Sequence, residues 1–170
     1  MKENEFNIIH LALKSRMNKE VKEIKKLYQA TIEGDGSVNF HSKCDNIPNT
    51  LVLIKSAGNR RFRGFTSQVW ESTSGSYKDD KNAFLFSLDK QRIYPYKNNG
   101  NAIYNNTNYG PTFGSGHDIC IINKAIQEKK LYTYESNSSS TYNYYGDSNG
   151  LSENGSGYWI FPVKYEVFQI

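Results

Sequence analysis

Short apolar runs separated by turn residues fill the chain from Thr50 onward. Residues 51–54 form an unbroken apolar run, which is typical of a strand buried on both faces. A turn at residues 57–59 then leads into a returning run at residues 60–67. Strands this short, joined by such turns, favour antiparallel sheets over parallel β-α-β units. We therefore predict an α+β fold: a sandwich of two packed antiparallel β-sheets with N-terminal and short flanking helices.

The later apolar runs complete the predicted sheets. Further strands are expected at residues 83–88, 92–94, 102–104, 119–122 and 165–170. Because side chains alternate between the two faces of a strand, a correct register buries whole sets of alternate residues together. The side chains expected to be mostly buried are those of Leu51, Leu53, Phe84, Phe86, Ile119, Ile121, Val167 and Ile170.

The N-terminal region has helical periodicity, and residues 5–28 are predicted to be helical with a break at Asn18. The apolar stripe of this region consists of Phe6, Ile9, Leu13 and Met17, continued by Val21, Ile24 and Leu27 or Tyr28. We expect the first helix to pack on its own domain rather than on a partner, since most amphipathic helices cover their own core. A short helix is predicted at residues 37–45, with Ser37 as its N-cap.

Residues 133–157 are rich in Ser, Asn, Tyr and Gly, which predicts a long loop or an irregular hairpin that need not pack by itself. Its tyrosines (Tyr142, Tyr144 and Tyr145) are able to stack on bases, but no basic groove accompanies them. The net charge is only +4. The basic side chains fall into two small groups that we interpret as solvated faces: Lys14, Arg16, Lys19, Lys22, Lys25 and Lys26, and then Arg60, Arg61 and Arg63. Nucleic acid is therefore not an expected partner.

The cellular setting is inferred from what the sequence contains at its start and from its cysteines. The first residues carry charges rather than the apolar run of a secretory signal, and no stretch approaches the roughly 20 apolar residues of a membrane helix. Two cysteines, Cys44 and Cys120, do not make a disulfide scaffold. We expect an intracellular, cytoplasmic protein with no integral membrane segment, with reduced thiols and with structural rather than reactive cysteines.

The glycine-rich segment at residues 114–118 is the most chemically suggestive motif, but a strand follows it where a phosphate-binding loop opens a helix. Ser115 lacks the GxSxG context of a nucleophile, and the adjacent His117 and Asp118 are expected to point in opposite directions. The scattered carboxylates, including Asp79 and Asp80 in a charged loop, offer no acid and base pair. The expected role of the segment is a sharp turn, in which Gly114 or Gly116 adopts backbone angles costly for other residues, and no catalytic residue is assigned.

A repeated spacing, His41-x-x-Cys44 and His117-x-x-Cys120, offers two histidines and two cysteines, which is a legal ligand set for zinc. His41 and Cys44 can share a helix face, whereas His117 and Cys120 would face opposite ways on a strand. A nucleophilic pair of Cys44 and His41 lacks an orienting third group. We therefore predict no metal and no cofactor.

Several ordered segments resemble the TLDc family, the domain of oxidation-resistance proteins. They are residues 28–31, 40–46, 50–55, 62–67, 82–88 and 165–170, together with Trp70 and the most specific segment, NYGPTFGSGHDI at residues 108–119. The resemblance carries the family-motif residues Gly110, Pro111, Gly114, Gly116, His117, Asp118 and Glu166. It places the domain at residues 27–170, after an N-terminal helical extension at residues 1–26.

The resemblance implies a sandwich of two antiparallel sheets, no established enzymatic activity and no obligatory cofactor. It links the chain to protection from oxidative stress and to binding of the vacuolar proton-pumping ATPase. The sequence departs from the family at residues 32–35, where Ile-Glu-Gly-Asp replaces Arg-Asp-Gly-aromatic, and at Arg63, where the family has glycine. The family motif does not call for a cysteine at position 120.

Three functions compete at this point. The first is a regulatory protein-binding module that targets the proton-pumping ATPase, with Arg60, Arg61 and Arg63 as a possible partner contact. The second is a structural subunit of a large cytoskeletal or mitochondrial assembly. The third is an enzyme centred on residues 114–118. We expect the first, with no catalytic activity.

Overall fold

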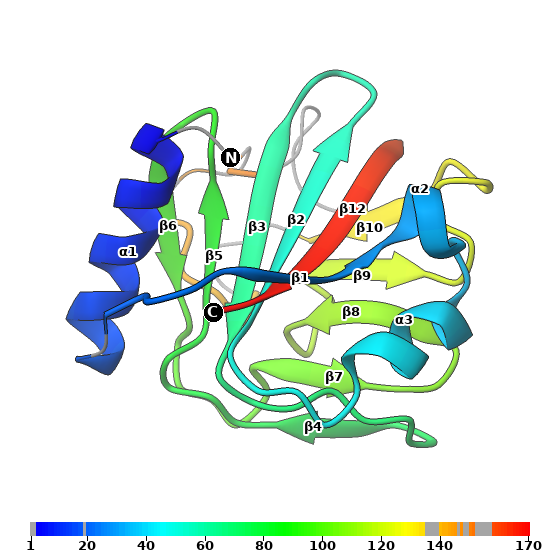
Figure 1. Ribbon diagram of the computed structural model, residues 1–170, viewed down its shortest axis with the longest axis horizontal. Coiled ribbons are helices and arrows are strands. Elements are labelled where there is room, and N and C mark those ends of the chain that lie inside the picture. The colour runs from blue at the N-terminus through cyan, green and yellow to red at the C-terminus, as the bar shows by residue number, and fades with distance from the viewer. Residues whose placement is uncertain (1–2, 19, 135–139, 146, 148–149, 152–157) are drawn as a thin grey trace.

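The computed structural model of the protein describes residues 3–18, 20–134, 140–145, 147, 150–151 and 158–170. In this part of the chain two antiparallel sheets of six strands each pack face to face, and helix α1 (Glu3–Met17) lies against the outer face of one of them (Figure 1). The predicted α+β sandwich is confirmed, with a helix as a third layer.

The strand order of each sheet shows how the two ends of the chain are brought together. The first sheet runs β1 (Lys25–Gln29), β12 (Pro162–Gln169), β2 (Thr50–Ser56), β3 (Arg61–Thr66), β5 (Phe84–Ser87), β6 (Arg92–Pro95). The second runs β11 (Tyr158–Ile160), β10 (Leu131–Thr133), β9 (Ile119–Ile122), β8 (Tyr109–Phe113), β7 (Ile103–Asn105), β4 (Ser76–Lys78). The last strand, β12, therefore pairs with both β1 and β2.

Side chains of the first sheet are buried on both of its faces. In β2, Val52 and Ile54 point into the space between the sheets, while Leu51 points to the opposite face. Helix α3 (Ser37–Cys44) contacts β1 of the first sheet and β8 of the second, and its Phe40 side chain is buried in the core between the sheets.

The predicted burial of eight strand residues is confirmed for Leu51, Phe84, Phe86, Ile119, Ile121 and Val167, which are at most 1 % exposed. Leu53 and Ile170 are only partly buried. Both lie at the margin of the surface that α1 covers, where Leu53 lines one hollow and Ile170 another.

The first helix packs on its own domain, as predicted. Ile9, Ala12 and Leu13 are buried on one side of α1, while Leu11 is exposed. They form one apolar cluster with outer-face side chains of the first sheet, namely Leu51, Phe65, Phe84, Phe86 and Leu88. The Phe6 side chain and Lys19 lie outside the described residues.

The prediction of helix as far as residue 28 is wrong. The helix ends at Met17, and Asn18 adopts a left-handed backbone conformation with φ of 51°. Residues 25–29 form β1, which pairs with β12 and buries Tyr28 completely while Leu27 is only partly buried. The apolar residues of this segment recur at every third position, which predicts a helix. Pairing with β12 stabilises a strand instead, because tertiary contacts outweigh local helix propensity. The boundary between residues 26 and 27 falls inside β1, and that division stays a prediction.

The short helix at residues 37–45 is confirmed as α3, but Ser37 is not its N-cap. Gly36 occupies that position, and the backbone N–H of Ser37 donates instead to Oδ1 of Asn123, 2.9 Å away. A single-turn helix, α2 (Ala30–Glu33), precedes it. The asparagine acts from a distant loop, so no local sequence rule for capping identifies it.

The predicted loop at residues 133–157 is more tightly packed than expected. Residues 135–139, 146, 148–149 and 152–157 lie outside the described set. Tyr142 and Tyr144 are wholly buried in the core between the sheets. The idea that these two rings are available to stack on bases is therefore wrong, because their faces are already packed against Tyr96 and Tyr94.

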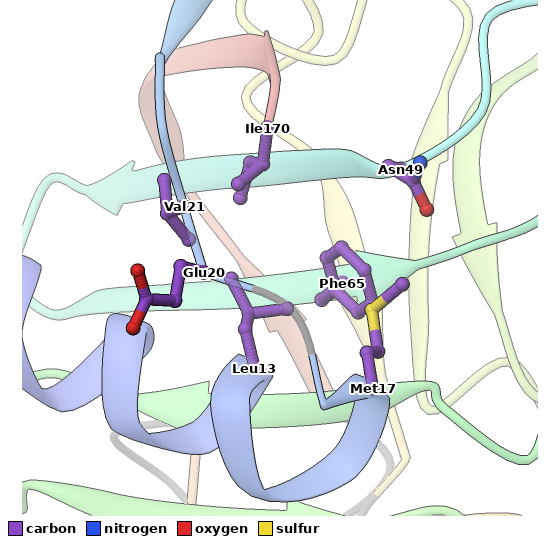
Figure 2. Close-up of a pocket in the computed structure, with 7 residues that line it drawn as sticks. All are labelled: Leu13, Met17, Glu20, Val21, Asn49, Phe65 and Ile170. Carbon is purple, nitrogen blue, oxygen red and sulfur yellow. The ribbon is translucent and has the colours of Figure 1, made fainter.

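The contact between α1 and the first sheet leaves one small gap. Figure 2 shows Leu13 and Met17 of α1 directed toward Phe65 of β3, with Val21 and Ile170 beside them. The cavity among these side chains is about 50 Å³. Ligand sites in proteins usually occupy several hundred Å³. This cavity is much smaller, so we interpret it as a packing defect between α1 and the sheet and not as a binding site.

Two leucines of α1 provide a matched test of this packing. Leu13 is 2 % exposed and Leu11 is 64 % exposed. We expect Leu13→Ala to lower the free energy of unfolding by about 2–4 kcal/mol, because it leaves a cavity in a packed layer. Leu11→Ala should change it by less than about 0.5 kcal/mol. Urea denaturation measures both, and equal effects would show that α1 does not stabilise the sheet.

Candidate functional site

The segment at residues 114–118 is a tight turn between β8 and β9. Gly114 adopts φ of 83°, and the backbone N–H of His117 donates to the carbonyl of Gly114, 3.2 Å away. A side chain at position 114 would collide with the Asp118 carboxylate, whereas one at Gly116 would meet only the Tyr134 ring at 3.4 Å. The strained glycine is therefore Gly114 rather than Gly116, and His117 takes the second left-handed position with φ of 58°.

Asp118 anchors the long loop that follows β10. Its side chain is wholly buried, and its carboxylate accepts backbone N–H bonds from Thr141 at 3.0 Å and Tyr142 at 3.2 Å. Burial raises the pKa of Asp118 to about 7, although these two N–H donors favour the charged form. Asp118 thus bonds to loop backbone that is distant in sequence, and the role that follows from this contact is structural.

The structure does not assemble Ser115, His117 and Asp118 into a catalytic set. Ser115 is held by Thr141, whose Oγ1 accepts the Ser115 backbone N–H at 2.8 Å and lies 3.1 Å from its hydroxyl. His117 contacts the Tyr104 and Tyr109 rings, with centroids 5.5 and 6.1 Å away, and burial lowers its pKa. The imidazole is therefore directed toward rings, while the Asp118 carboxylate is directed toward the loop backbone.

The four residues of the possible zinc set lie on different sides of the second sheet. Cys44 is in the core between the sheets, and Cys120 points to the outer face. Both nitrogens of His41 are engaged, with Asp45 Oδ1 at 2.7 Å from Nδ1 and the carbonyls of Asn106 and Tyr109 at 3.0 Å from Nε2. Across the described chain, no three His, Cys, Asp or Glu side chains are grouped to hold a metal ion.

One expectation about this set is wrong. His117 and Cys120 line the same hollow, although strand alternation predicted that they would face opposite ways. The reason is that β9 begins at Ile119, so that His117 belongs to the preceding turn and the alternation of a strand does not apply to it.

Strand register places a line of side chains across the outer face of the second sheet. Tyr77 pairs with Tyr104, and Ile103 pairs with Phe113, which puts Tyr104 beside Thr112. The line continues through the pairs Thr112 with Cys120, Cys120 with Tyr132 and Tyr132 with Trp159. We call it the transverse row: Tyr77, Tyr104, Thr112, Cys120, Tyr132 and Trp159.

The transverse row faces away from the core. Its neighbours in sequence, such as Ile103, Phe113 and Ile119, are buried between the two sheets. Tyr77 and Trp159, at the two ends of the row, are 43 % and 49 % exposed. Exposed aromatic side chains are the residue types most enriched at protein-binding hot spots.

A hollow of about 400 Å³, which we call the trough, lies in the middle of this face. Thr112 and Cys120 of the transverse row are small and buried there, between Tyr104 and Tyr132. The trough is lined by Tyr109, Ser115, Gly116, His117, Cys120, Ile122, Tyr132 and Trp159. The family-motif residues Gly116 and His117 are therefore part of the lining of a surface hollow.

The remaining family-motif residues have packing roles. A side chain at Gly110 would meet Ile121 at 3.2 Å, so glycine allows β8 and β9 to approach closely, and Pro111 is buried in the same strand. Glu166 is on the outer face of the first sheet, where Lys26 Nζ lies 2.7 Å and Lys164 Nζ 3.1 Å from its carboxylate oxygens. Burial alone would raise the pKa of Glu166, but the bonds from these two lysines outweigh it and the pKa is lowered.

The three arginines of the possible partner contact do not share an open surface. Arg63 is 1 % exposed and lines a hollow of about 390 Å³ with Lys26, Lys164 and Glu166. Arg61 pairs with Asp89, with 3.3 Å between Nε and Oδ1. Arg63 is therefore removed from the predicted contact, which stays a prediction for Arg60 and Arg61.

Neither the transverse row nor the trough was predicted from the sequence. The available signal was an aromatic residue at the centre of each of three short runs: Tyr77, Tyr132 and Trp159. Only the register brings these residues into line, and register depends on pairings that a single strand does not specify.

No helix among the described residues has the length and apolar character needed to cross a membrane.

The turn provides a matched pair of glycine substitutions. We expect Gly114→Val to lower the free energy of unfolding by on the order of 1–3 kcal/mol, because valine is strained at this backbone angle and crowds Asp118. Gly116→Val should cost less than about 0.5 kcal/mol. Thermal and urea melting of both variants measure this difference, and wild-type stability of Gly114→Val would disprove the strain.

The cysteines are expected to be structural and free of metal. Cys44 is wholly buried and Cys120 is 3 % exposed, and burial raises the pKa of both thiols, to about 11 for Cys120. Since the thiolate is the reactive form, a thiol reagent should modify the native protein at least about tenfold more slowly than the unfolded protein. Two thiols that react at free-cysteine rates, or one zinc per chain by elemental analysis, would contradict this.

None of the curated proteins compared with this chain matches it. The family model described as the TLDc domain matches residues 1–170, and thus includes α1 as well as the sandwich. Since the match extends over the whole sequence, the protein belongs to the TLDc domain family.

Proposed function

We propose that the protein is a non-catalytic, regulatory protein-binding module and that the transverse row is its contact face. The observation that carries this proposal is the half-exposed Trp159 at one end of the row, followed at alternate positions by the exposed Phe161 and Val163. Single exposed apolar residues are common on protein surfaces, but a half-exposed tryptophan that lines an aromatic hollow and is followed in sequence by two more exposed apolar residues is typical of a binding surface.

The absence of catalysis is supported by the geometry of the turn at residues 114–118. Ser115 bonds to Thr141, His117 lies against tyrosine rings and Asp118 is used by loop backbone. A nucleophile needs a base within hydrogen-bond reach, and each of these side chains is directed to a different neighbour.

For the partner we propose the vacuolar proton-pumping ATPase, as the resemblance to the TLDc family implies, and therefore a cytoplasmic location. Protection from oxidative stress would then be an effect of regulation. This is consistent with the burial of Cys44 and Cys120, since a directly antioxidant thiol needs exposure and a lowered pKa.

Capture of the purified proton-pumping ATPase on immobilised protein tests this proposal. We expect Trp159→Ala to reduce the retained pump at least tenfold, because large aromatic side chains dominate binding energy at interfaces. The matched control is Tyr145→Ala, which removes a 59 % exposed ring that lies beside Arg92 of the first sheet. Unchanged melting temperatures of both variants establish that the fold is intact.

The outcomes separate the components of the proposal. Equal capture by the wild type and Trp159→Ala would exclude the transverse row as the contact face. No capture of the pump, with the native chain instead held in a stable cytoskeletal or mitochondrial particle, would exclude the proposed partner. Turnover of any substrate lost on His117→Ala would exclude the non-catalytic assignment.

A further inference from the structure

The trough has two aromatic walls. On one side the Tyr109 and His117 rings meet edge to face, with centroids 6.1 Å apart, and on the other Tyr132 and Trp159 do the same at 5.5 Å. The floor between them includes Cys120, which is 3 % exposed. The volume of the trough, about 400 Å³, is within the range of ligand sites.

The spacing of the walls follows from the sheet. Tyr132 pairs with Cys120 and Cys120 with Thr112, so the floor extends across three neighbouring strands. Neighbouring strands are separated by about 4.8 Å, which puts the outer two about 10 Å apart. A ligand that contacts both walls must therefore present suitable groups at intervals close to this distance.

The lining of the trough is uncharged and rich in hydrogen-bond donors. Its described lining residues include no Lys, Arg, Asp or Glu, and burial lowers the pKa of His117 and so favours its neutral form. Three donors of the lining have no hydrogen-bond partner within the described residues: the Tyr109 hydroxyl, the Tyr132 hydroxyl and Trp159 Nε1–H. A charge does lie close to one of these rings, since Lys130 Nζ is 5.7 Å from the Trp159 ring centroid. Indole is a donor only, and a phenol readily donates.

From these features we propose that the trough binds a proline-rich segment of the partner protein in the polyproline II conformation. Such a helix repeats every three residues, or about 9 Å, which matches the separation of the walls. Proline has no backbone N–H, so the segment offers carbonyl acceptors to the phenol and indole donors. Aromatic-lined grooves are a recurring means of recognising this conformation. The inference rests on the proposed protein-binding function and specifies the chemistry of its contact.

A sugar is the competing ligand for aromatic rings, and the lining disfavours it. Sugar hydroxyls donate as well as accept hydrogen bonds, and the described lining offers them as side-chain acceptors only hydroxyls and the neutral His117 ring, with no carboxylate or side-chain amide. An anionic ligand is disfavoured because the trough has no cationic side chain among its described lining residues.

The two tryptophans provide an internal control for the test. Trp70 is 1 % exposed, and its Nε1–H donates to Thr50 Oγ1 at 2.8 Å, whereas Trp159 is 49 % exposed. When a decaproline peptide is titrated into the full chain, the NMR signal of the Trp159 indole N–H should shift and that of Trp70 should stay fixed. A ten-residue Gly-Ser peptide should shift neither signal.

Three variants, each retaining both tryptophans, identify the site. Tyr132→Ala should weaken decaproline binding at least tenfold, since it removes one wall. Tyr132→Phe keeps the ring and should weaken it about threefold, through loss of the hydroxyl donor alone. Tyr145→Ala, distant from the trough, should change it less than twofold. Equal affinity of Tyr132→Ala and the wild type would overturn the site.

Two further results would overturn the proposal. One is a Trp159 signal that stays fixed at millimolar decaproline, and the other is a larger shift with a neutral oligosaccharide than with decaproline. If the pump is captured in a Trp159-dependent way but decaproline does not bind, only this inference fails. If decaproline binds but Trp159→Ala leaves pump capture unchanged, only the proposed function fails.

Discussion

The first sheet must be covered on both of its faces, and the positions of the other layers follow from this requirement. Leu51 and Val52 are adjacent in β2, point in opposite directions and are both buried. The second sheet covers one of these faces and α1 covers part of the other. In the second sheet the apolar core lies on the inner side of the described strands, and the aromatic side chains of the transverse row lie on the outer side. The open position of the proposed contact face is thus a consequence of how the layers are stacked.

Two carboxylates fix the loops around this arrangement. Asp118 receives backbone N–H groups of the loop after β10, and Asp35 Oδ2 receives those of Ile126 at 2.6 Å and Gln127 at 3.0 Å. A carboxylate removed from water is unstable without such donors. Each loop is therefore held in the position where its N–H groups reach the carboxylate. Asp35 follows α2 at a position where the resemblance to the family implies an aromatic residue, and here its carboxylate clamps the segment before β10.

The sheets could be predicted from sequence where a strand is apolar on both faces, as in β2 and β5, because local composition alone identifies such runs. The strands β1, β4, β8, β10 and β11 were not predicted, because their short or glycine- and proline-containing runs give a weak local signal and strand pairing supplies the conformation. The turn at Gly114 was predictable from glycine chemistry, whereas the choice of Gly114 over Gly116 depended on Asp118. Asp80, expected in a charged loop, is buried and accepts hydrogen bonds from Thr66 and Ser67.

The place of β12 between β1 and β2 has a consequence for biosynthesis. Lys25 pairs with Gln169, so β1 emerges from the ribosome long before its partner strand exists. Until then β1 and one edge of β2 have unpaired backbone groups, and the first sheet is completed only when the final described residues have been made. A topology with such distant pairings has a high contact order and folds slowly, and its unpaired edges are open to aggregation in the meantime.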